Sequence, residues 1–169
     1  LLLMLAGTVR QKRKLKALPC MDDANARAEL DELKKLVGIR DNAKIQIRSG
    51  VDSTFLTFMG GQYVIALEDG YTQEERRRVL AHELTHLAHG DLIYNLISAF
   101  FLAAFWWNPV IWLAFRRFRR DMEVYCDYDA ARKTGDKKGY AETLVRAAAG
   151  TERFILGTTS FIGGEKEIS

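Results

Sequence analysis

The sequence is poor in cysteine, proline and histidine. Each of these low counts limits the folds or the kinds of site that the chain can contain. Its 169 residues contain 2 cysteines, too few for a disulfide-stabilised scaffold. Cys20 and Cys126 are expected to be free thiols that form neither a disulfide nor a metal-binding pair. The 2 prolines mark two breaks, at Pro19 and at Pro109. Two of the 3 histidines fall in one five-residue segment, so the histidine chemistry is concentrated there.

The charge is nearly balanced, with 25 basic and 22 acidic residues and a net charge of +3. The basic residues gather in residues 10–16 and 116–120, and each cluster follows an apolar stretch. Neither cluster has the interleaved pattern of a nucleic-acid module, so no direct nucleic-acid binding is expected. Clusters in this position are typical of the cytoplasmic side of membrane segments. We therefore expect a protein of the cell membrane whose main domain faces the cytoplasm.

The chain divides into three parts and has no internal repeat or low-complexity segment. Residues 1–18 begin with an apolar run and indicate the end of a longer transmembrane helix followed by a basic juxtamembrane segment. Residues 19–157 are expected to form the main domain. Residues 158–169 have weak periodicity and are expected to be a tail or linker.

Within the main domain, the hydrophobic pattern predicts a helix over residues 22–37 and short strands over residues 44–67, with a hairpin turn at Gly60-Gly61. A capping box between Thr72 and Glu75 predicts a helix that ends at about His89. Further helices are predicted beyond it, including a charged helix that ends at about Lys133 and a short one over residues 140–149. This order indicates an α+β fold with a small β-sheet.

The strongest chemical signal is the His-Glu-Leu-Thr-His segment at residues 82–86 of that capped helix. Positions i and i+4 of a helix lie one turn apart on the same face, about 6 Å from each other, so two imidazoles can bind one ion. An ordinary helix can match this pattern by chance, but the helix cap and the uncharged flanks favour a metal helix. His82 and His86 are therefore predicted to bind Zn²⁺, and Glu83 to act as the catalytic base of a metallopeptidase.

A catalytic zinc usually has three protein ligands, so a third is needed. His89 is one candidate, but a continuous helix carries it away from the other two histidines. Glu123 is the better candidate, and Asp127, four residues later, can orient a ligand histidine. Spacing alone leaves an alternative equally open, in which both carboxylates are solvated partners of neighbouring arginines.

The most apolar part of the chain, residues 92–115, is long enough to span a bilayer if straight. A helix from residue 86 to 108 carries the chain ~33 Å away from His86. If His86 and Glu123 bind one ion, the chain must turn and come back over the same distance before Glu123. Asn108-Pro109 is where it can turn. We therefore expect a helical hairpin embedded in the membrane, with three tryptophans near its turn. A buried hairpin in a soluble core is the alternative, but a domain this small offers little to cover it.

Several segments together resemble the zinc-peptidase domain of the BlaR/MecR antirepressor family of bacterial membrane proteins, over nearly the whole chain. Their combined order and spacing are much more specific than the histidine motif alone. The matching segments are Leu80–His86, Asp91–Asn95, Phe105–Pro109 with Trp112, Arg119–Glu123 with Cys126-Asp127, and Ser160–Gly164.

The resemblance implies that Glu123 is the third zinc ligand of a gluzincin-like, and hence zincin-like, domain facing the bacterial cytoplasm. It also implies a transducer whose extracellular sensor domain lies outside these residues. The expected protein substrate is a transcriptional repressor, the chain itself, or both, and Ser160-Phe161 is the expected place of self-cleavage. Membrane lipid and a second copy of the chain, as a homodimer, complete the expected partners.

The predicted function is thus zinc-assisted peptide hydrolysis by a signal-transducing antirepressor of the β-lactam-sensor type. One strand within residues 54–67 is expected to pair with the substrate. Two alternatives remain: a membrane quality-control zinc protease, and a catalytically silent transducer in which zinc only holds helices together. The residue that stabilises the oxyanion also stays open; the candidates are Tyr125, Tyr128, Tyr140 and His89.

Overall fold

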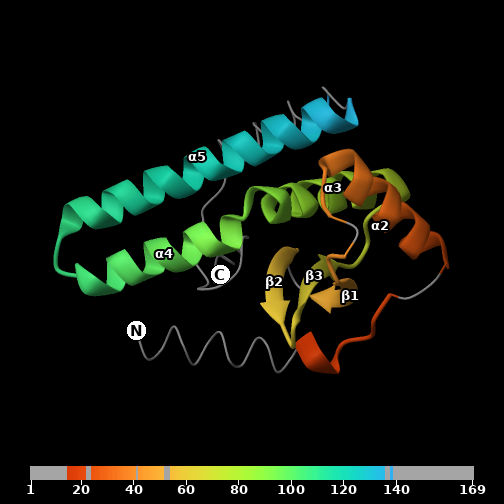
Figure 1. The fold of residues 1–169 in the computed structure, drawn as a ribbon, viewed down its shortest axis with the longest axis horizontal. Coiled ribbons are helices and arrows are strands. Elements are labelled where there is room, and N and C mark those ends of the chain that lie inside the picture. Colours follow the sequence, from red (N-terminus) through yellow and green to blue (C-terminus); the bar gives the residue numbers. More distant parts are fainter. Residues whose placement is uncertain (1–14, 22–23, 41, 52–53, 136–137, 139–169) are drawn as a thin grey trace, which may run out of the picture.

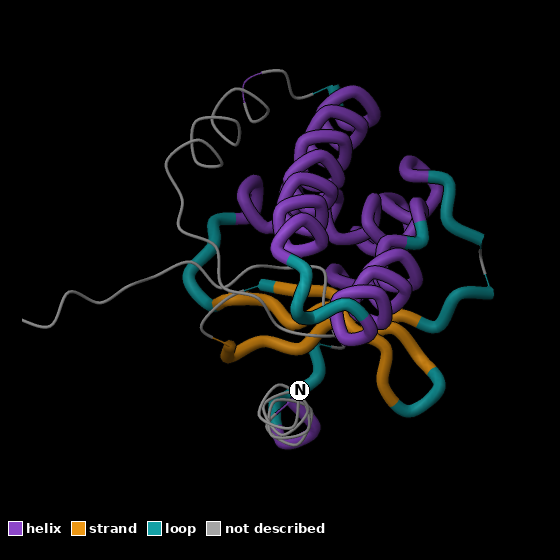
Figure 2. The backbone as a smooth tube through the Cα atoms, turned by 90° about the vertical axis from the view of Figure 1, so that its left-hand side faces the viewer, coloured by secondary structure: helices purple, strands orange, loops and turns teal. Residues whose placement is uncertain are grey.

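The computed structural model describes residues 15–21, 24–40, 42–51, 54–135 and 138. The elements along the chain are α2 (Ala24–Val37), β1 (Ile45–Val51), β2 (Phe55–Met59), β3 (Gln62–Glu68), α3 (Gln73–His89), α4 (Asp91–Ala104) and α5 (Pro109–Thr134). Figures 1 and 2 show the helices gathered on one side of a small sheet. The α+β arrangement predicted from the sequence is therefore confirmed.

The sheet has the order β1-β3-β2, with β3 parallel to β1 and antiparallel to β2. The antiparallel pair is the hairpin predicted from the sequence. Its two-residue turn requires positive φ at both positions, and Gly60 and Gly61 have φ of 63° and 82°. Because β3 is central, β2 supplies an outer edge of the sheet, whereas β1 is bridged on its outer side by Cys20, opposite Arg48.

The central strand β3 is buried on both faces, which explains its nearly continuous apolar sequence. Successive side chains of a strand point to opposite faces. Ile65 and Leu67 belong to the larger core, which joins the sheet to α2 and α3. Val64 and Ala66 pack on the other face with Phe55 and with Leu15 from the N-terminal side. The sheet therefore supports the middle of α3 from one side.

Helix α3 begins and ends where the sequence predicts. The Thr72 hydroxyl accepts from the Glu75 amide at 3.3 Å, and the Glu75 carboxylate accepts from the Thr72 amide at 2.9 Å. Gly90 ends the helix with φ 75°, a left-handed conformation that glycine adopts without strain. α4 follows at once, and its axis is bent by 64° from that of α3.

α4 and α5 form the helical hairpin that the apolar segment predicts. Asn108 caps α5 by accepting from the Val110 amide at 2.9 Å, and Pro109 occupies the first turn, where its missing amide costs nothing. The Trp112 indole donates to the Trp106 carbonyl at 2.9 Å and closes the turn. After the turn, the rest of the apolar segment and the charged helix beyond it are one continuous helix, α5, which runs back along α4 and α3 (Figure 1).

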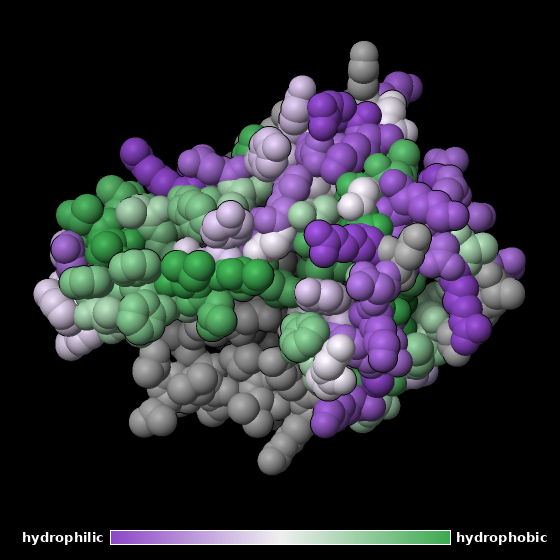
Figure 3. All heavy atoms as spheres, in the orientation of Figure 1, coloured by the Kyte–Doolittle hydropathy of each residue, from purple (hydrophilic) through white to green (hydrophobic). Residues whose placement is uncertain are grey.

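The outer surface of the hairpin is strongly apolar. Large hydrophobic side chains gather over α4 and the turn, at one end of the molecule (Figure 3). Those more than half exposed there are Ile93, Tyr94, Leu96, Phe100, Trp106, Trp107, Val110 and Leu113. Within the described residues, no single helix is long and apolar enough to cross a bilayer; α3 and α4 together satisfy length and composition, but across their bend.

Some sequence-based predictions fall outside the described residues. These are the apolar run within residues 1–14, the helix over residues 140–149 with Tyr140, and the tail over residues 158–169 with Ser160 and Phe161. They stay predictions.

The core between α2 and the sheet is expected to dominate the stability of the domain. Leu33 is fully buried in it, so Leu33→Ala should lower the free energy of unfolding by about 2–5 kcal/mol. Leu36→Ala, on the same helix but 40% exposed, is the matched control and should have a much smaller effect. Urea unfolding followed by circular dichroism measures both; equal effects would contradict the packing described.

Candidate metal centre

The two histidines of the motif face each other on α3. Their Nε2 atoms lie 3.0 Å apart, and the rings are nearly perpendicular at 88°. This follows from the helical i, i+4 spacing, which places both side chains on one face. His86 is fully buried, and 24% of the His82 side chain is exposed, so the pair opens toward solvent on one side.

Helix α5 brings the Glu123 carboxylate to this pair. Glu123 Oε2 lies 3.6 Å from His82 Nε2 and 3.4 Å from His86 Nε2. The three ligand atoms all lie within 4.8 Å of one another. The apolar excursion through α4 and the turn is what allows residues so distant in sequence to meet. The structure therefore brings together His82, His86 and Glu123, which the sequence analysis proposed as ligands of one ion.

Both imidazoles are held from behind by carboxylates. His82 Nδ1 donates to Asp127 Oδ1 at 2.8 Å, which is the contact expected of Asp127. His86 Nδ1 donates to Asp91 Oδ2 at 2.6 Å. The role of Asp91 could not be predicted from helical spacing; the signal in the sequence is an aspartate placed directly after the glycine that ends the motif helix. These bonds leave both Nε2 atoms available as ligands.

The donor set fits a divalent metal such as zinc. Two imidazole nitrogens and one carboxylate are a frequent catalytic zinc set, which leaves a further position for water. Glu123 Oε1 is buried and accepts no hydrogen bond from the described residues, although Arg119 Nη2 lies 3.9 Å away, so the cost of burying this oxygen is only partly compensated. A metal bound by Glu123 would offset part of that cost.

The charges of the cluster shift its protonation strongly. Burial lowers the pKa of His82, but its contacts with Asp127 and Glu123 outweigh burial and raise that pKa well above its usual value. For His86, burial is again outweighed, here by the charge of Glu123 and the bond to Asp91, and its pKa rises to about 9. Burial raises the pKa of Glu123, but the two histidines lower it by more than burial raises it. The net effect is a lowered pKa, so this carboxyl stays ionised.

Glu83 is buried and directly follows His82 on α3. Its negative charge is among the causes that raise the pKa of His82. A carboxylate beside the ligand atoms, but outside the group of three, can serve as an acid–base group.

A second group of polar side chains lies behind His86. The Cys126 sulfur, fully buried, lies 3.0 Å from His86 Nδ1 and 3.2 Å from Asp91 Oδ2. Burial, followed by the charge of Asp91, raises the pKa of Cys126, so it remains a neutral thiol. The predicted free thiol is confirmed, but nothing in the sequence indicates that it lies beside the histidine.

Of the four oxyanion candidates, three lie in the described residues, and Tyr140 lies outside them. His89 Nε2 is paired with Asp129 Oδ2 at 3.0 Å, and its ring lies against Tyr125. Tyr125 and Tyr128 are more than half exposed on α5. His89 is not part of the group of three possible ligands.

The whole chain, residues 1–169, matches the family described as BlaR1 peptidase M56. The chain belongs to this family. It is 29% identical to the regulatory protein BlaR1 of Bacillus licheniformis over 113 residues, 63% of this chain and 19% of that protein. It is 33% identical to the methicillin resistance mecR1 protein of Staphylococcus aureus over 54 residues, 32% of this chain and 9% of that protein.

Membership in the BlaR1 peptidase M56 family indicates a metallopeptidase and confirms the resemblance drawn from the sequence motifs. The matched stretches cover a fifth or less of the two relatives, 19% and 9%. What those whole proteins do is therefore carried to this chain only as a proposal.

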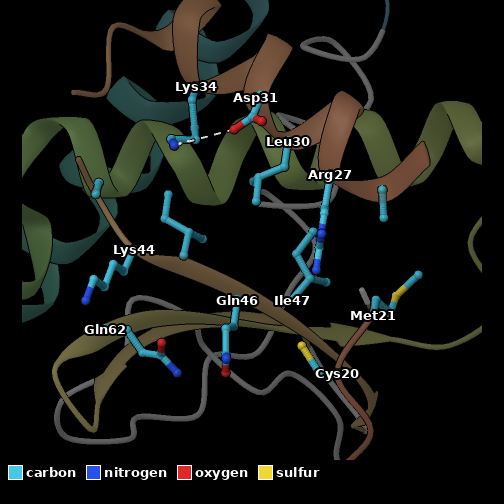
Figure 4. Close-up of a pocket in the computed structure, with 13 residues that line it drawn as sticks. Cys20, Met21, Arg27, Leu30, Asp31, Lys34, Lys44, Gln46, Ile47 and Gln62 are labelled. Atoms are coloured by element: carbon cyan, nitrogen blue, oxygen red, sulfur yellow. Dashed lines mark ion pairs between the residues drawn. The ribbon is translucent and has the colours of Figure 1, made fainter. Parts of the chain in front are cut away.

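A cavity of about 420 Å³ lies apart from the candidate metal centre, between α2 and β1 (Figure 4). Arg27, Lys34 and Lys44 give its lining a basic character, and Lys34 pairs with Asp31 at 3.5 Å. None of its lining residues belongs to the metal centre, and the cavity is not the candidate site of this peptidase family member.

The protonation of His86 predicts how the metal-free chain responds to pH. Its pKa is about 9 in the folded chain, against a usual 6.5, so the folded state keeps a proton that the unfolded state loses. This stabilisation is complete below pH 6.5 and disappears as the pH rises through about 9. His82 contributes in the same direction.

Thermal unfolding in the presence of a chelator, measured across this pH range, tests the prediction. The midpoint should fall as the pH rises, and His86→Gln should flatten that dependence. An equally steep dependence in His86→Gln would show that another group is responsible.

Proposed function

We propose that this chain is the catalytic part of a membrane-embedded zinc metalloendopeptidase that serves signal transduction. The observation that carries the proposal is the convergence of His82, His86 and Glu123, with both imidazoles oriented by carboxylates. Zinc is favoured among divalent metals because imidazole and carboxylate ligands, with one open position, are typical of its catalytic sites.

Different residues of the chain have different roles in the proposed peptide hydrolysis. Bound zinc would supply Lewis-acid activation of the scissile carbonyl and of the attacking water. Glu83 takes the proton of that water and delivers it to the leaving amine, because it directly follows His82 on α3, is buried, and is not one of the three proposed ligands. Asp127 keeps His82 in the tautomer that presents Nε2 to the site.

The proposed substrate is a protein: a transcriptional repressor, the chain itself at Ser160-Phe161, or both. The printed names of the relatives, a regulatory protein and a methicillin resistance protein, support a regulatory role within antibiotic resistance. An extended substrate segment would pair with the outer edge of β2, since β3 is central in the sheet.

Replacing the proposed base tests the mechanism. Glu83→Gln should lower the cleavage rate of the repressor or of the chain by about 10²–10⁴-fold while zinc remains bound. Glu123→Ala, in contrast, should lose zinc as well as activity. Metal content and cleavage are measured on the same preparations; undiminished cleavage by Glu83→Gln would refute the assignment of the base.

The alternative of a quality-control protease uses the same centre on a different substrate. Limited cleavage at one or a few bonds of a repressor supports the regulatory proposal, and broad degradation of misfolded membrane proteins supports the alternative. Incubation of the purified chain with both kinds of substrate separates them.

We further propose that the α4–α5 hairpin is embedded in the membrane. Its exposed apolar side chains form one continuous surface over α4 and the turn (Figure 3). The turn carries Trp106 and Trp107, side chains typical of membrane interfaces. The exposed basic side chains of Arg116, Arg117 and Arg120 follow on α5, where they can meet acidic phosphates of the inner leaflet. Their position supports the proposal that the metal centre faces the cytoplasm.

All 3 tryptophans of the chain lie at this turn, so their fluorescence reports on the hairpin alone. In vesicles, the emission should shift to shorter wavelength and be quenched by lipids with brominated acyl chains. Phe100→Arg, on the exposed face of α4, should reduce the quenching, and Phe58→Arg, exposed on β2, is the matched control. Emission typical of water, without quenching, would refute the insertion.

A further inference from the structure

Helix α4 buries two polar side chains although its surface is otherwise apolar and largely exposed. Asp91 is 4% exposed and Asn95 is 3% exposed, and the remaining buried residue of this helix is Leu102. Asp91 and Asn95 are one helical turn apart, so they share one face. Burial of polar groups is costly unless each has a specific partner, so the partners of these two residues are informative.

Asp91 reaches the first of the proposed ligands. Its Oδ2 accepts from His86 Nδ1 at 2.6 Å and from the Cys126 thiol at 3.2 Å. The carboxylate is thus fixed between α3 and α5. A carboxylate held in this way determines both the tautomer and the ring orientation of the histidine.

Asn95 reaches another ligand through an arginine. Its Oδ1 accepts from Arg119 Nη1, and Arg119 is 1% exposed. The Nη2 of the same guanidinium lies 3.9 Å from Glu123 Oε1. Arg119 therefore occupies a fixed place between Asn95 on α4 and Glu123, which is one turn away on α5.

We propose that Asp91 and Asn95 are positioning residues through which α4 holds two metal ligands, His86 directly and Glu123 through Arg119. The inference rests on the proposed function, because it takes these two side chains as ligands. It assigns to the first helix of the hairpin a role that its apolar sequence does not suggest. A change in the direction of α4 at Gly90 would therefore alter the positions of both proposed ligands, His86 and Glu123.

The test measures zinc affinity of the full chain in detergent by competition with a chelator. Asp91→Ala should weaken zinc binding by about 10–100-fold, and Asn95→Ala by about 10-fold, as expected for residues that orient ligands. Tyr94→Ala, exposed on the same helix between the two, is the matched control and should bind as wild type.

A second readout separates positioning from a general loss of stability. The absorption spectrum of the Co²⁺-loaded chain reports ligand geometry, and it should change in Asp91→Ala and Asn95→Ala but not in Tyr94→Ala. Asp91→Asn and Asn95→Asp keep an oxygen acceptor, so each should bind more tightly than its alanine variant. If an alanine variant does not fold, Asp91→Asn should still bind more weakly than wild type.

The outcomes distinguish this inference from the proposed function. If wild type binds no zinc, or Glu123→Ala binds as wild type does, the proposed metal centre fails. If these two behave as expected but the substitutions of Asp91 and Asn95 leave affinity and the cobalt spectrum unchanged, the positioning role alone is overturned.

Discussion

The structure depends on one contact, that of the Glu123 carboxylate with the imidazoles of His82 and His86. Burying an ionised carboxylate is costly unless an opposite charge compensates it. In the metal-free chain the protonated histidines supply that charge, as the raised pKa values of both show. The need to compensate the buried charge of Glu123 also favours a divalent cation at this place. Because Glu123 must lie beside the two histidines, the same need determines where α5 packs against α3.

The hairpin serves both the metal centre and the proposed membrane surface. Its inner face supplies Glu123 and Asp127 from α5 and Asp91 from α4, and its outer face is apolar. The proposed insertion would therefore act on helices that also hold ligands. The sheet has a separate part in this arrangement, since it fixes α2 and the middle of α3 through a common core.

Much of the fold could be predicted from the sequence because its signals are local. The capping box at Thr72, the glycine pair at residues 60 and 61, and the Asn108-Pro109 break each determine backbone conformation within a few residues. The parallel pairing of β1 with β3 could not be predicted, because a strand's partner depends on contacts across the domain rather than on its own side-chain pattern.

For the site, the sequence by itself determined the His82 and His86 pair, because helical spacing places positions i and i+4 on one face, and it put Glu83 beside them. Family motifs then favoured Glu123 and Asp127, which spacing alone left open. Only the tertiary structure decided that Asp91 and Cys126 lie behind His86 and that Asn95 reaches Arg119. These contacts join separate helices, and the angle at which helices cross is set by packing in three dimensions.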